Sequence, residues 1–431
     1  MYPQDRLERE TLTTLQSARL EATLDHVRAS TTPYWQEKMA GVPEITSVAD
    51  IHALPFTEKA EFREAYPTAM IAVPMERVVR VHASSGTSGK PTIVAYSAGD
   101  VAVFGEVNAR AMSLAGATPE DIVQVAYGYG LFTGGLGLHY GVESLGATAI
   151  PASGGNPGFQ VHLMADMGVT GLCATPSFTV ILAERAIAEG VKDRIDLRWG
   201  VHGAEPWTNE LRDKIEDLWG GGYHACDIYG LSEVIGPGVA SECVEGKGSL
   251  HVFEDHFYPE IVDPETGDPL PEGERGELVL TSLSKEAQPV LRYRTRDITR
   301  FNPEPCPCGR TLRRIDRLAG RADDMLIIRG INVYPTTIES IILEDPSLGG
   351  HFYLIVDKRG TLPELHARVE LKHAADLGEA DAIATRLQAR LMEVIRLRVN
   401  IEVMAPGALP RNELGKTKRV WEQTTDEDPL G

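Results

Sequence analysis

Ser84-Ser85-Gly86-Thr87-Ser88-Gly89-Lys90-Pro91-Thr92 is a run of hydroxyl and glycine residues followed by a lysine, a proline and a threonine. Glycine lets backbone N–H groups turn toward an anion at little steric cost, and hydroxyls add donors that rotate to fit. A loop of this composition suits phosphate oxygens. It is not a Walker loop, because that pattern needs Gly at position 84 and a Ser or Thr directly after Lys90. Such a run can also be a plain surface turn, so the rest of the chain has to supply the other parts of a phosphate site.

The composition is that of an ordinary soluble globular protein, with 42% hydrophobic and 24% charged residues. At 431 residues the chain is longer than one core normally allows, so we expect two or three domains. The formal net charge of −20 argues against general binding to nucleic acid or to an anionic membrane. The sequence has no run of 18 apolar residues and no signal pattern, and its five cysteines suit a reducing compartment. These features predict a cytoplasmic protein.

Strand-like and helix-like stretches alternate after the phosphate-loop candidate. The expected strands are 122–126, 147–150, 171–174 and 197–202, and the expected helices are 100–115, 134–145, 176–189 and 208–219. Such alternation predicts a mainly parallel sheet covered by helices. Ligands of these sheets bind beyond the carboxyl ends of the strands, which selects the loops 127–133, 175–177 and 203–207.

Three other regions complete the predicted α/β architecture. Residues 5–30 carry leucines near helical spacing and predict a helix packed on the main body. Residues 227–320 predict a β-rich subdomain of the large domain 1–321, with strands at 250–257, 260–262, 276–282 and 289–293. Residues 322–431 predict a small α+β domain, with strands near 352–357, 364–371 and 399–404 and a helix near 378–397.

Four further motifs follow the phosphate-loop candidate in order. They are Tyr229-Gly230-Leu231-Ser232-Glu233, Tyr293-Arg294-Thr295-Arg296-Asp297, the segment from Gly320-Arg321-Ala322-Asp323-Asp324 to Arg329-Gly330, and the basic run from Arg411 through Lys416 to Lys418-Arg419. Each also has a plain structural explanation: a surface carboxylate, a local ion pair, a loop and a solvated tail. Their chemistry nevertheless suits a nucleotide. Carboxylates bind hard cations and accept pairs of hydroxyl hydrogen bonds, and a mobile lysine neutralises charge on phosphate.

These motifs, in this order over residues 84–419, resemble those of the adenylate-forming enzymes, which include acyl- and aryl-CoA ligases, adenylation domains and luciferases. The resemblance implies a small C-terminal domain that moves about a hinge at Asp323. It implies that Lys416 is the adenylation lysine, that Glu233 holds Mg²⁺ and that Ser232 contacts phosphate. The residues that it implies for ATP and AMP binding are Ser84, Ser85, Gly86, Thr87, Ser88, Gly89, Lys90, Gly203, Ala204, Glu205, Pro206, Asp227, Tyr229, Gly230, Asp297 and Arg321.

The same resemblance implies separate roles within this set. Tyr229 would lie against adenine, Asp297 would accept the two ribose hydroxyls, and Arg321 would contact ribose and phosphate. The segment Gly203-Ala204-Glu205-Pro206 would line the adenine side. The residues expected to face CoA are Arg329, Gly330, Lys418 and Arg419.

Two segments, Tyr127–Gly135 and Glu254–Ile261, resemble phenylacetate–CoA ligases and related aryl-CoA ligases. This resemblance implies an ATP-dependent enzyme that converts phenylacetate, or a benzoate-type acid such as anthranilate, to an acyl-AMP and passes the acyl group to CoA. Aromatic walls and small residues suit a flat ring. The expected acyl pocket consists of Tyr129, Phe132, Ala204, Ile235, Gly236 and Pro237.

Two other functions fit the same motifs. A stand-alone adenylating enzyme would load an aryl acid onto a carrier protein with the same core residues. A catalytically silent nucleotide-binding protein is the alternative of another class, although intact Lys416, Glu233 and Asp297 argue against it. A homodimer is expected only from the family resemblance.

Cys243, His251, Cys306 and Cys308 form a separate candidate group. Cys306-Pro307-Cys308 places two thiols on one turn, and Cys243 and His251 lie in the preceding β-rich region. Three thiolates and an imidazole can make a closed tetrahedral Zn²⁺ site, which would be structural because no position is left open. Lone cysteines are more often buried hydrophobes, and this is the expectation for Cys173 and Cys226.

Overall fold

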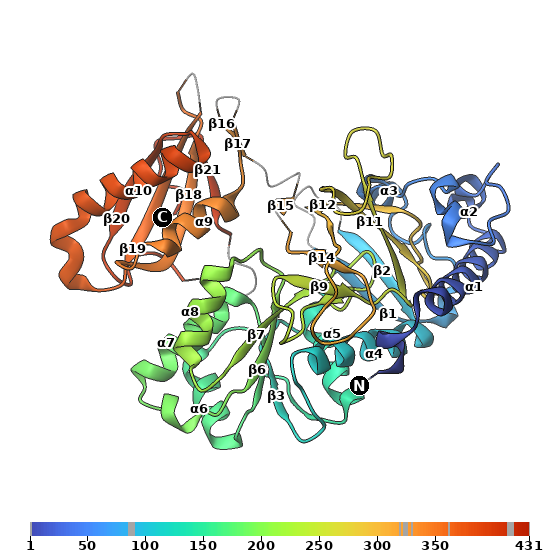
Figure 1. Ribbon diagram of the computed structural model, residues 1–431, viewed down its shortest axis with the longest axis horizontal. Coiled ribbons are helices and arrows are strands. Elements are labelled where there is room, and N and C mark those ends of the chain that lie inside the picture. The colour runs from blue at the N-terminus through green and yellow to red at the C-terminus, as the bar shows by residue number, and fades with distance from the viewer. Residues whose placement is uncertain are drawn as a thin grey trace.

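The computed structural model describes residues 2–84, 91–318, 320–321, 326–328, 331–360, 363–411 and 418–430. It has a large body and a smaller C-terminal unit that lies beside helices α7 and α8 of the body (Figure 1). Within the described residues, no helix is both long and apolar enough to cross a membrane.

A nine-stranded sheet forms the centre of the large body, in the order β13-β14-β9-β8-β7-β6-β5-β3-β4. Its parallel half consists of β3 (Ile122–Val125), β4 (Thr148–Ile150), β5 (Gly171–Ala174), β6 (Trp199–Gly203) and β7 (His224–Tyr229). Its antiparallel half consists of β8 (Ala240–Ser241), β9 (Ser249–Val252), β13 (Phe301–Asn302) and β14 (Arg314–Asp316). The expected parallel strands are confirmed, and the sheet continues beyond them as an antiparallel one.

Helices cover both faces of this sheet because its parallel strands are apolar on both sides. In β5, Cys173 packs with α4 (Ala98–Leu114) and α5 (Gly134–Leu145), whereas Leu172 and Ala174 pack with α6 (Pro157–Met167), α7 (Pro176–Ala188) and α8 (Asn209–Trp219). Helices α4 and α5 approach closely at Gly141, where a Cβ would lie 2.5 Å from the Cβ of Asn108. The predicted helices are confirmed within two residues, and α6 was not predicted.

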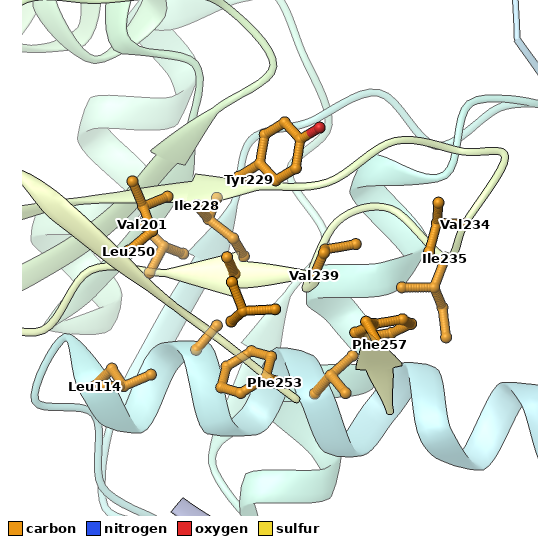
Figure 2. Packing of buried hydrophobic residues seen from close by; sticks show 14 of the residues in the cluster. Leu114, Val201, Ile228, Tyr229, Val234, Ile235, Val239, Leu250, Phe253 and Phe257 are labelled. Carbon is orange, nitrogen blue, oxygen red and sulfur yellow. The ribbon is translucent and has the colours of Figure 1, made fainter. Parts of the chain in front are cut away.

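The core between α4 and the sheet also holds the chain that follows β7. Figure 2 shows Val234, Ile235 and Val239 from this chain gathered with Phe253 and Phe257. All five side chains are at most 1% exposed. Apolar packing between α4 and the central sheet therefore fixes the segment after Tyr229.

The N-terminal region is a set of short helices against a second sheet. It contains η1 (Pro3–Arg6), α1 (Arg9–Arg28), α2 (Pro33–Lys38), η2 (Val48–Ala53), α3 (Lys59–Glu64), η3 (Met75–Arg77) and the hairpin of β1 (Val78–Ser84) with β2 (Thr92–Ser97). The second sheet is antiparallel and consists of β10 (Phe257–Val262), β11 (Gly276–Ser282), β12 (Tyr293–Thr299) and β15 (Gly320–Arg321). The predicted long N-terminal helix thus starts at Arg9, after a separate 3₁₀ turn.

Two strand predictions in the β-rich region were wrong. Residues 289–293 are not a strand, since the chain folds back so that Ser282 N–H donates to the Val290 carbonyl (2.9 Å), and β12 begins at Tyr293. Residues 250–257 are broken by a turn in which Phe257 N–H donates to the Phe253 carbonyl (3.0 Å). The region 227–320 consequently contributes strands to both sheets of the large body.

The C-terminal unit has its own core around a four-stranded sheet in the order β20-β19-β18-β21. Its elements are the hairpin β16 (Leu326–Ile328) and β17 (Ile331–Val333), α9 (Pro335–Glu344), β18 (Leu348–Asp357), β19 (Glu364–Leu371), η5 (Ala374–Glu379), α10 (Ala380–Ile395), β20 (Val399–Met404) and β21 (Val420–Gln423). The three predicted strands and the predicted helix are confirmed, while α9 and β21 were not predicted. The domain boundary at 321/322 stays a prediction, because 322–325 lie outside the described residues.

Candidate active site

Tyr127 ties together the carboxyl ends of three parallel strands. Its hydroxyl donates to the Ala174 carbonyl (2.8 Å) and accepts from Gly203 N–H (3.0 Å). Burial raises the pKa of Tyr127 well above its usual value. The loops that follow β3, β5 and β6 therefore converge, as the sheet topology predicted.

The segment after β6 is held in an unusual backbone conformation. Gly203 cannot carry a side chain, because a Cβ there would lie 2.3 Å from the Ile228 carbonyl oxygen. Ala204 has a φ of +68°, in the left-handed region that non-glycine residues rarely adopt. Strain of this kind is maintained by surrounding structure and is concentrated at functional sites.

Glu205 reaches across to the first turn of α7. Its carboxylate accepts from the Ser177 hydroxyl (2.7 Å) and from Ser177 N–H (3.4 Å). A helix N-terminus favours a negative charge. The structure thus joins the 203–207 loop to the 175–177 loop through a residue of the candidate adenine segment.

Tyr229 and Asp297 meet although they are 68 positions apart in the sequence. The Tyr229 hydroxyl donates to Asp297 Oδ2 at 2.6 Å, and the two side chains are 9% and 6% exposed. Tyr229 ends β7 of the central sheet, whereas Asp297 lies in β12 of the second sheet and pairs with Arg321 in β15. Two sheets therefore deliver their candidate nucleotide residues to one place.

Asp227 lies two residues before Tyr229 in β7. Burial raises its pKa to about 6, against the opposing charge of Arg317, whose Nε is 3.4 Å from Asp227 Oδ2. Arg317 also stacks over the Trp207 ring at 4.4 Å and reaches Glu242 at 3.4 Å. Asp227 is thus part of a buried charge network at the end of β7.

Ser232 and Glu233 follow directly. The Ser232 hydroxyl lies 3.2 Å from the Thr133 hydroxyl at the start of α5, and Glu233 Oε1 lies 3.7 Å from Lys59 Nζ at the start of α3. Glu233 is only 5% exposed, and carboxylate oxygens are the ligands that a hard divalent ion prefers. Thr133 and Lys59 were missed, because the sequence around Lys59 indicated only a helix start.

The candidate acyl-pocket residues lie on two loops. Ile235, Gly236 and Pro237 follow Glu233, and a Cβ on Gly236 would lie 2.5 Å from the Leu231 backbone. On the loop before α5, the Tyr129 hydroxyl lies 3.3 Å from His139 Nδ1, and Phe132 is 37% exposed. Their shared role in a pocket, together with Ala204, stays a prediction.

Several candidates fall outside the described residues. These are Ser85, Gly86, Thr87, Ser88, Gly89, Lys90, Asp323, Arg329, Gly330 and Lys416, and the side chains of Ser84 and Arg321 are likewise not described. Of the CoA candidates, Lys418 stacks on the Trp421 ring (4.0 Å). Arg419 stacks on Phe352 (4.5 Å) and lies 3.8 Å from Glu339.

Contacts between the two units gather around α7, α8 and α9. Lys214 of α8 donates to the Gly349 carbonyl, and His351 Nε2 lies 3.3 Å from Glu184 of α7. Glu339 of α9 is 4% exposed, and burial raises its pKa to about 7. The small unit therefore packs against helices that begin at the candidate adenine side.

Cys243, His251, Cys306 and Cys308 form a buried group whose donor atoms all lie within 4.8 Å of one another. Cys243 Sγ is 3.5 Å from Cys306 Sγ, and Cys308 Sγ is 3.4 Å from His251 Nε2. Sulfur ligands of tetrahedral zinc are about 3.8 Å apart, so the spacing fits an ion and not a disulfide. All five cysteines are unpaired.

The backbone around the thiols also fits a metal centre. Gly246 N–H donates to Cys243 Sγ (3.2 Å), and a Cβ on Gly246 would lie 2.5 Å from Cys306 Sγ. Burial raises the pKa of the Cys308 thiol, but hydrogen bonds from His251 and Arg310 outweigh it and lower the pKa to about 5. Cys308 therefore favours the thiolate, the form that binds zinc, whereas burial and the neighbouring thiols raise the pKa of Cys243.

Comparison with known proteins gives two family matches along the chain. Residues 11–284 match the AMP-binding enzyme model, and residues 330–424 match the model of the AMP-binding enzyme C-terminal domain. The phenylacetate-coenzyme A ligase of Thermus thermophilus is 44% identical over 434 residues, covering 96% of this chain and 97% of that protein. The phenylacetate-coenzyme A ligase of Escherichia coli is 45% identical, covering 95% of this chain and 94% of that protein.

Solved structures of 2-hydroxyisobutyryl-CoA ligase resemble the chain to a degree that depends on their state. The structure in the postadenylation state with 2-HIB-AMP gives a TM-score of 0.90 at 26% identity, covering 97% of this chain and 91% of that one. The structure with 2-HIB-AMP and CoA in the thioesterification state covers the same shares at 27% identity, with a TM-score of 0.71. The fold is the same in both comparisons, so the difference reflects how the parts of the chain are arranged.

Proposed function

Because the chain belongs to the AMP-binding enzyme family, we propose that it is an ATP-dependent aryl-CoA ligase of the phenylacetate–CoA ligase type. It activates an aromatic carboxylate as an acyl-AMP, with loss of pyrophosphate, and transfers the acyl group to the CoA thiol, with loss of AMP. The observation that carries this proposal is the contact of Tyr229 with Asp297, 2.6 Å across two sheets, with Glu233 four residues after Tyr229. Phenylacetate is the first candidate acid, and benzoate-type acids such as anthranilate follow.

In the first half-reaction, the substrate carboxylate oxygen attacks the α-phosphorus and the bond to pyrophosphate breaks. Asp297 would accept the ribose hydroxyls, Tyr229 would lie against adenine and Ser232 would donate to phosphate. Mg²⁺ held by Glu233 would supply charge neutralisation for the triphosphate. The 84–90 loop and Lys416 would add the remaining donors, Lys416 acting as a cation beside the leaving phosphate.

In the second half-reaction, the thiol sulfur attacks the acyl carbon and the bond to the AMP oxygen breaks. Rotation about Asp323 would withdraw Lys416 and present Arg329 and Gly330 to the thiol path. The higher similarity to the relative's postadenylation state supports assigning the present arrangement to the time just after acyl-AMP forms. Arg419 contacts Glu339 and Phe352, which belong to the same C-terminal unit, so the rotation would carry Arg419 and these two partners together.

A structural Zn²⁺ at Cys243, His251, Cys306 and Cys308 belongs to the same proposal. The sulfur spacing and the Gly246 backbone support it. The ion would join the end of β8, strand β9 and the 306–308 turn. It would take no part in the chemistry, because four protein ligands leave no open position.

The location, the oligomeric state and the acyl acceptor belong to the same proposal. A cytoplasmic location fits five unpaired cysteines. A homodimer, and a carrier protein in place of CoA as acyl acceptor, are compatible with the same active-site residues. A catalytically silent nucleotide-binding protein would keep the fold without releasing pyrophosphate.

Pyrophosphate release against a panel of aryl acids, followed by thioester formation with free CoA, tests the proposed function. The Lys416→Ala variant should slow adenylation by about 10²–10³ because a preorganised charge is lost. It should largely spare thioester formation from supplied acyl-AMP. Lys358→Ala, which removes an exposed lysine paired with Glu422, is the matched control.

Wild-type protein that releases no pyrophosphate with any acid would refute the proposed activity and favour the silent alternative. Acyl transfer to a carrier protein but not to CoA would change the acceptor. Equal losses of both half-reactions in Lys416→Ala would contradict the role of that lysine.

A further inference from the structure

The segment after Tyr229 is held through three alternate carbonyl groups by side chains from three other elements. Lys285 Nζ donates to the Glu233 carbonyl (3.3 Å), and the Tyr96 hydroxyl donates to the Ile235 carbonyl (2.9 Å). Asn108 Nδ2 donates to the Pro237 carbonyl (3.2 Å). This segment carries both the candidate Mg²⁺ ligand and the candidate acyl-pocket residues, so these three contacts position two substrates at once.

Lys285 differs from the other two because it carries a charge. It is 4% exposed and forms no ion pair with any carboxylate of the described residues. Its ammonium lies over the Tyr96 ring, 5.0 Å from the centroid. A buried ammonium with one carbonyl partner is costly, and an apolar side chain of similar length would fill the same space more cheaply. The cost of burying this charge therefore indicates that the Lys285 ammonium has a functional role.

The backbone presents Lys285 rigidly to this place. The Asp100 carboxylate accepts from Glu286 N–H (2.6 Å) and Ala287 N–H (2.9 Å), directly after the lysine. On its other side, Leu283 N–H donates to the His256 carbonyl (2.8 Å). Lys285 is thus fixed from both sides, and its side chain is aimed at the Glu233 main chain.

The charged groups around Lys285 come from three elements. Burial lowers its pKa to about 8, while the charges of Asp100 and Glu233 oppose that shift. His82 of β1 also faces it, and burial lowers the pKa of His82, with a smaller contribution from the charge of Lys285.

We propose that Lys285 is a positioning residue for adenylation. Its buried ammonium fixes the Glu233 main chain, and through it the orientation of the carboxylate that would hold Mg²⁺·ATP. Tyr96 is its neutral counterpart on the acid side, because its bond to Ile235 fixes the acyl-pocket part of the same segment. The inference rests on the proposed function. It extends that function by assigning separate residues to two tasks: Lys285 positions the nucleotide-binding part of the segment, and Tyr96 positions the part that faces the carboxylic acid substrate.

The test compares Lys285→Met and Tyr96→Phe, with Lys358→Met as the control for an exposed lysine. Lys285→Met should raise the KM for Mg²⁺·ATP and weaken Mn²⁺-dependent ATP binding about tenfold or more, the scale of one charged hydrogen bond. Its melting temperature should not fall, because a buried charge is removed. Tyr96→Phe should raise the KM for the acid and leave ATP binding unchanged.

The conservative variant supplies the readout that a merely structural lysine would not change. Lys285→Arg keeps a charged donor at this place, so it should retain most of the ATP binding that Lys285→Met loses. The arginine variant keeps the test decisive if the methionine variant does not fold.

The inference is overturned if Lys285→Met keeps wild-type ATP binding, or if Lys285→Arg loses as much ATP binding as Lys285→Met. It is also overturned if Lys285→Met slows both half-reactions equally and melts earlier, since the lysine is then only structural. Wild-type protein without pyrophosphate release refutes the proposed function instead. An active wild type with an unaffected methionine variant refutes only the role of Lys285.

Discussion

Two buried groups in this protein look alike as sets of metal-binding side chains. One is the group of Cys243, His251, Cys306 and Cys308, and the other is the group of Glu106, Asp255 and His256. In both, the donor atoms lie within 4.8 Å of one another. They differ in what already neutralises their charge, and that difference decides which of them suits a metal ion.

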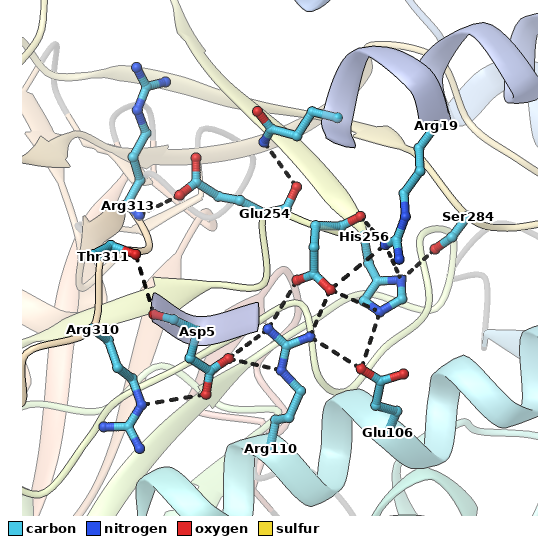
Figure 3. Close-up of polar contacts among 12 residues, drawn as sticks. Asp5, Arg19, Glu106, Arg110, Glu254, His256, Ser284, Arg310, Thr311 and Arg313 are labelled. Carbon is cyan, nitrogen blue, oxygen red and sulfur yellow. Dashed lines mark hydrogen bonds and ion pairs between the residues drawn. The ribbon is translucent and has the colours of Figure 1, made fainter. Parts of the chain in front are cut away.

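The carboxylate group already contains cations. Figure 3 shows Arg110 beside Asp5, Glu106 and His256, and its guanidinium also pairs with Asp255. Arg110 is fully buried, and its guanidinium lies 2.6 Å from Asp5 and 3.0 Å from Asp255. Arg19 adds a second guanidinium, 3.7 Å from Asp255. An additional divalent cation would be repelled by both.

The thiol group has three cysteines. Arg6 donates to the Cys308 carbonyl (2.9 Å), and the cation that hydrogen-bonds a thiol of the group is Arg310. That arginine is also drawn to Asp5, 3.5 Å from its Nε. Its pKa is raised because the hydrogen bond with Cys308 and the charge of that thiolate outweigh burial. Closely spaced soft donors with little internal compensation are what zinc neutralises. Proximity of ligand-type residues is thus not enough, and the internal charge balance distinguishes the two groups.

Removal of zinc is the largest effect expected from this comparison. Protein purified without added metal should contain about one zinc per chain. Stripping it with a strong chelator should lower the free energy of unfolding by roughly 4 kcal/mol or more, because structural zinc contributes folding energy directly. Elemental analysis and denaturant unfolding measure the two quantities.

Matched cysteine variants make this prediction specific. Cys308→Ala should lose the zinc, whereas Cys226→Ala, which removes a buried thiol from the central core, should retain it. A zinc content near zero in the wild type, or an equal loss in both variants, would show that the thiol group is only a packed cluster.

The arginine-centred group should respond next most strongly. Arg110→Leu leaves Asp5 and Asp255 buried without their main partner and should cost about 3–5 kcal/mol in unfolding free energy. Zinc content should not change. Arg19→Leu, at a partly exposed arginine, should cost about 1 kcal/mol or less.

The same variant can also reverse the comparison. Without the guanidinium, Glu106, Asp255 and His256 lack the cation that excludes a metal. Added Mn²⁺ or Zn²⁺ should therefore restore part of the lost stability of Arg110→Leu and have no such effect on the wild type. A divalent ion that stabilises both proteins equally would mean that Arg110 does not exclude metal.

The sequence predicted best the features that depend on residues close together in the chain. The strands after the phosphate loop follow from alternating apolar runs, and Tyr229 and Asp297 follow from short motifs read as a family resemblance. The cysteine group was found because Cys306-Pro307-Cys308 places two thiols on one turn, which needs no knowledge of the fold.

What the sequence could not predict depends on distant partners. Nothing around Lys285 shows that it is buried, since its neighbours Ser284 and Glu286 are polar. Arg110 meets Asp5 and Asp255 across 105 and 145 positions, so its role exists only in the folded chain. The strand expected at 289–293 failed for a related reason: the return of the chain to Ser282 is made by a side chain and a backbone bond that periodicity does not reveal.

The smallest expected effect is a change in unfolding free energy at low pH. Burial raises the pKa of Asp255, but the charges of His256 and Arg110 outweigh it and hold that pKa below the ordinary value of 3.8. A carboxylate with a lowered pKa stabilises the fold above its unfolded pKa, and this contribution is lost as pH falls through the folded pKa. The difference in unfolding free energy between the wild type and Arg110→Leu should therefore narrow below about pH 4, because only the wild type has this contribution to lose. Denaturant unfolding from pH 6 to 3, with zinc content followed in parallel, measures it. A difference that stays constant over that range would place the stabilising charge of Arg110 on a partner other than Asp255.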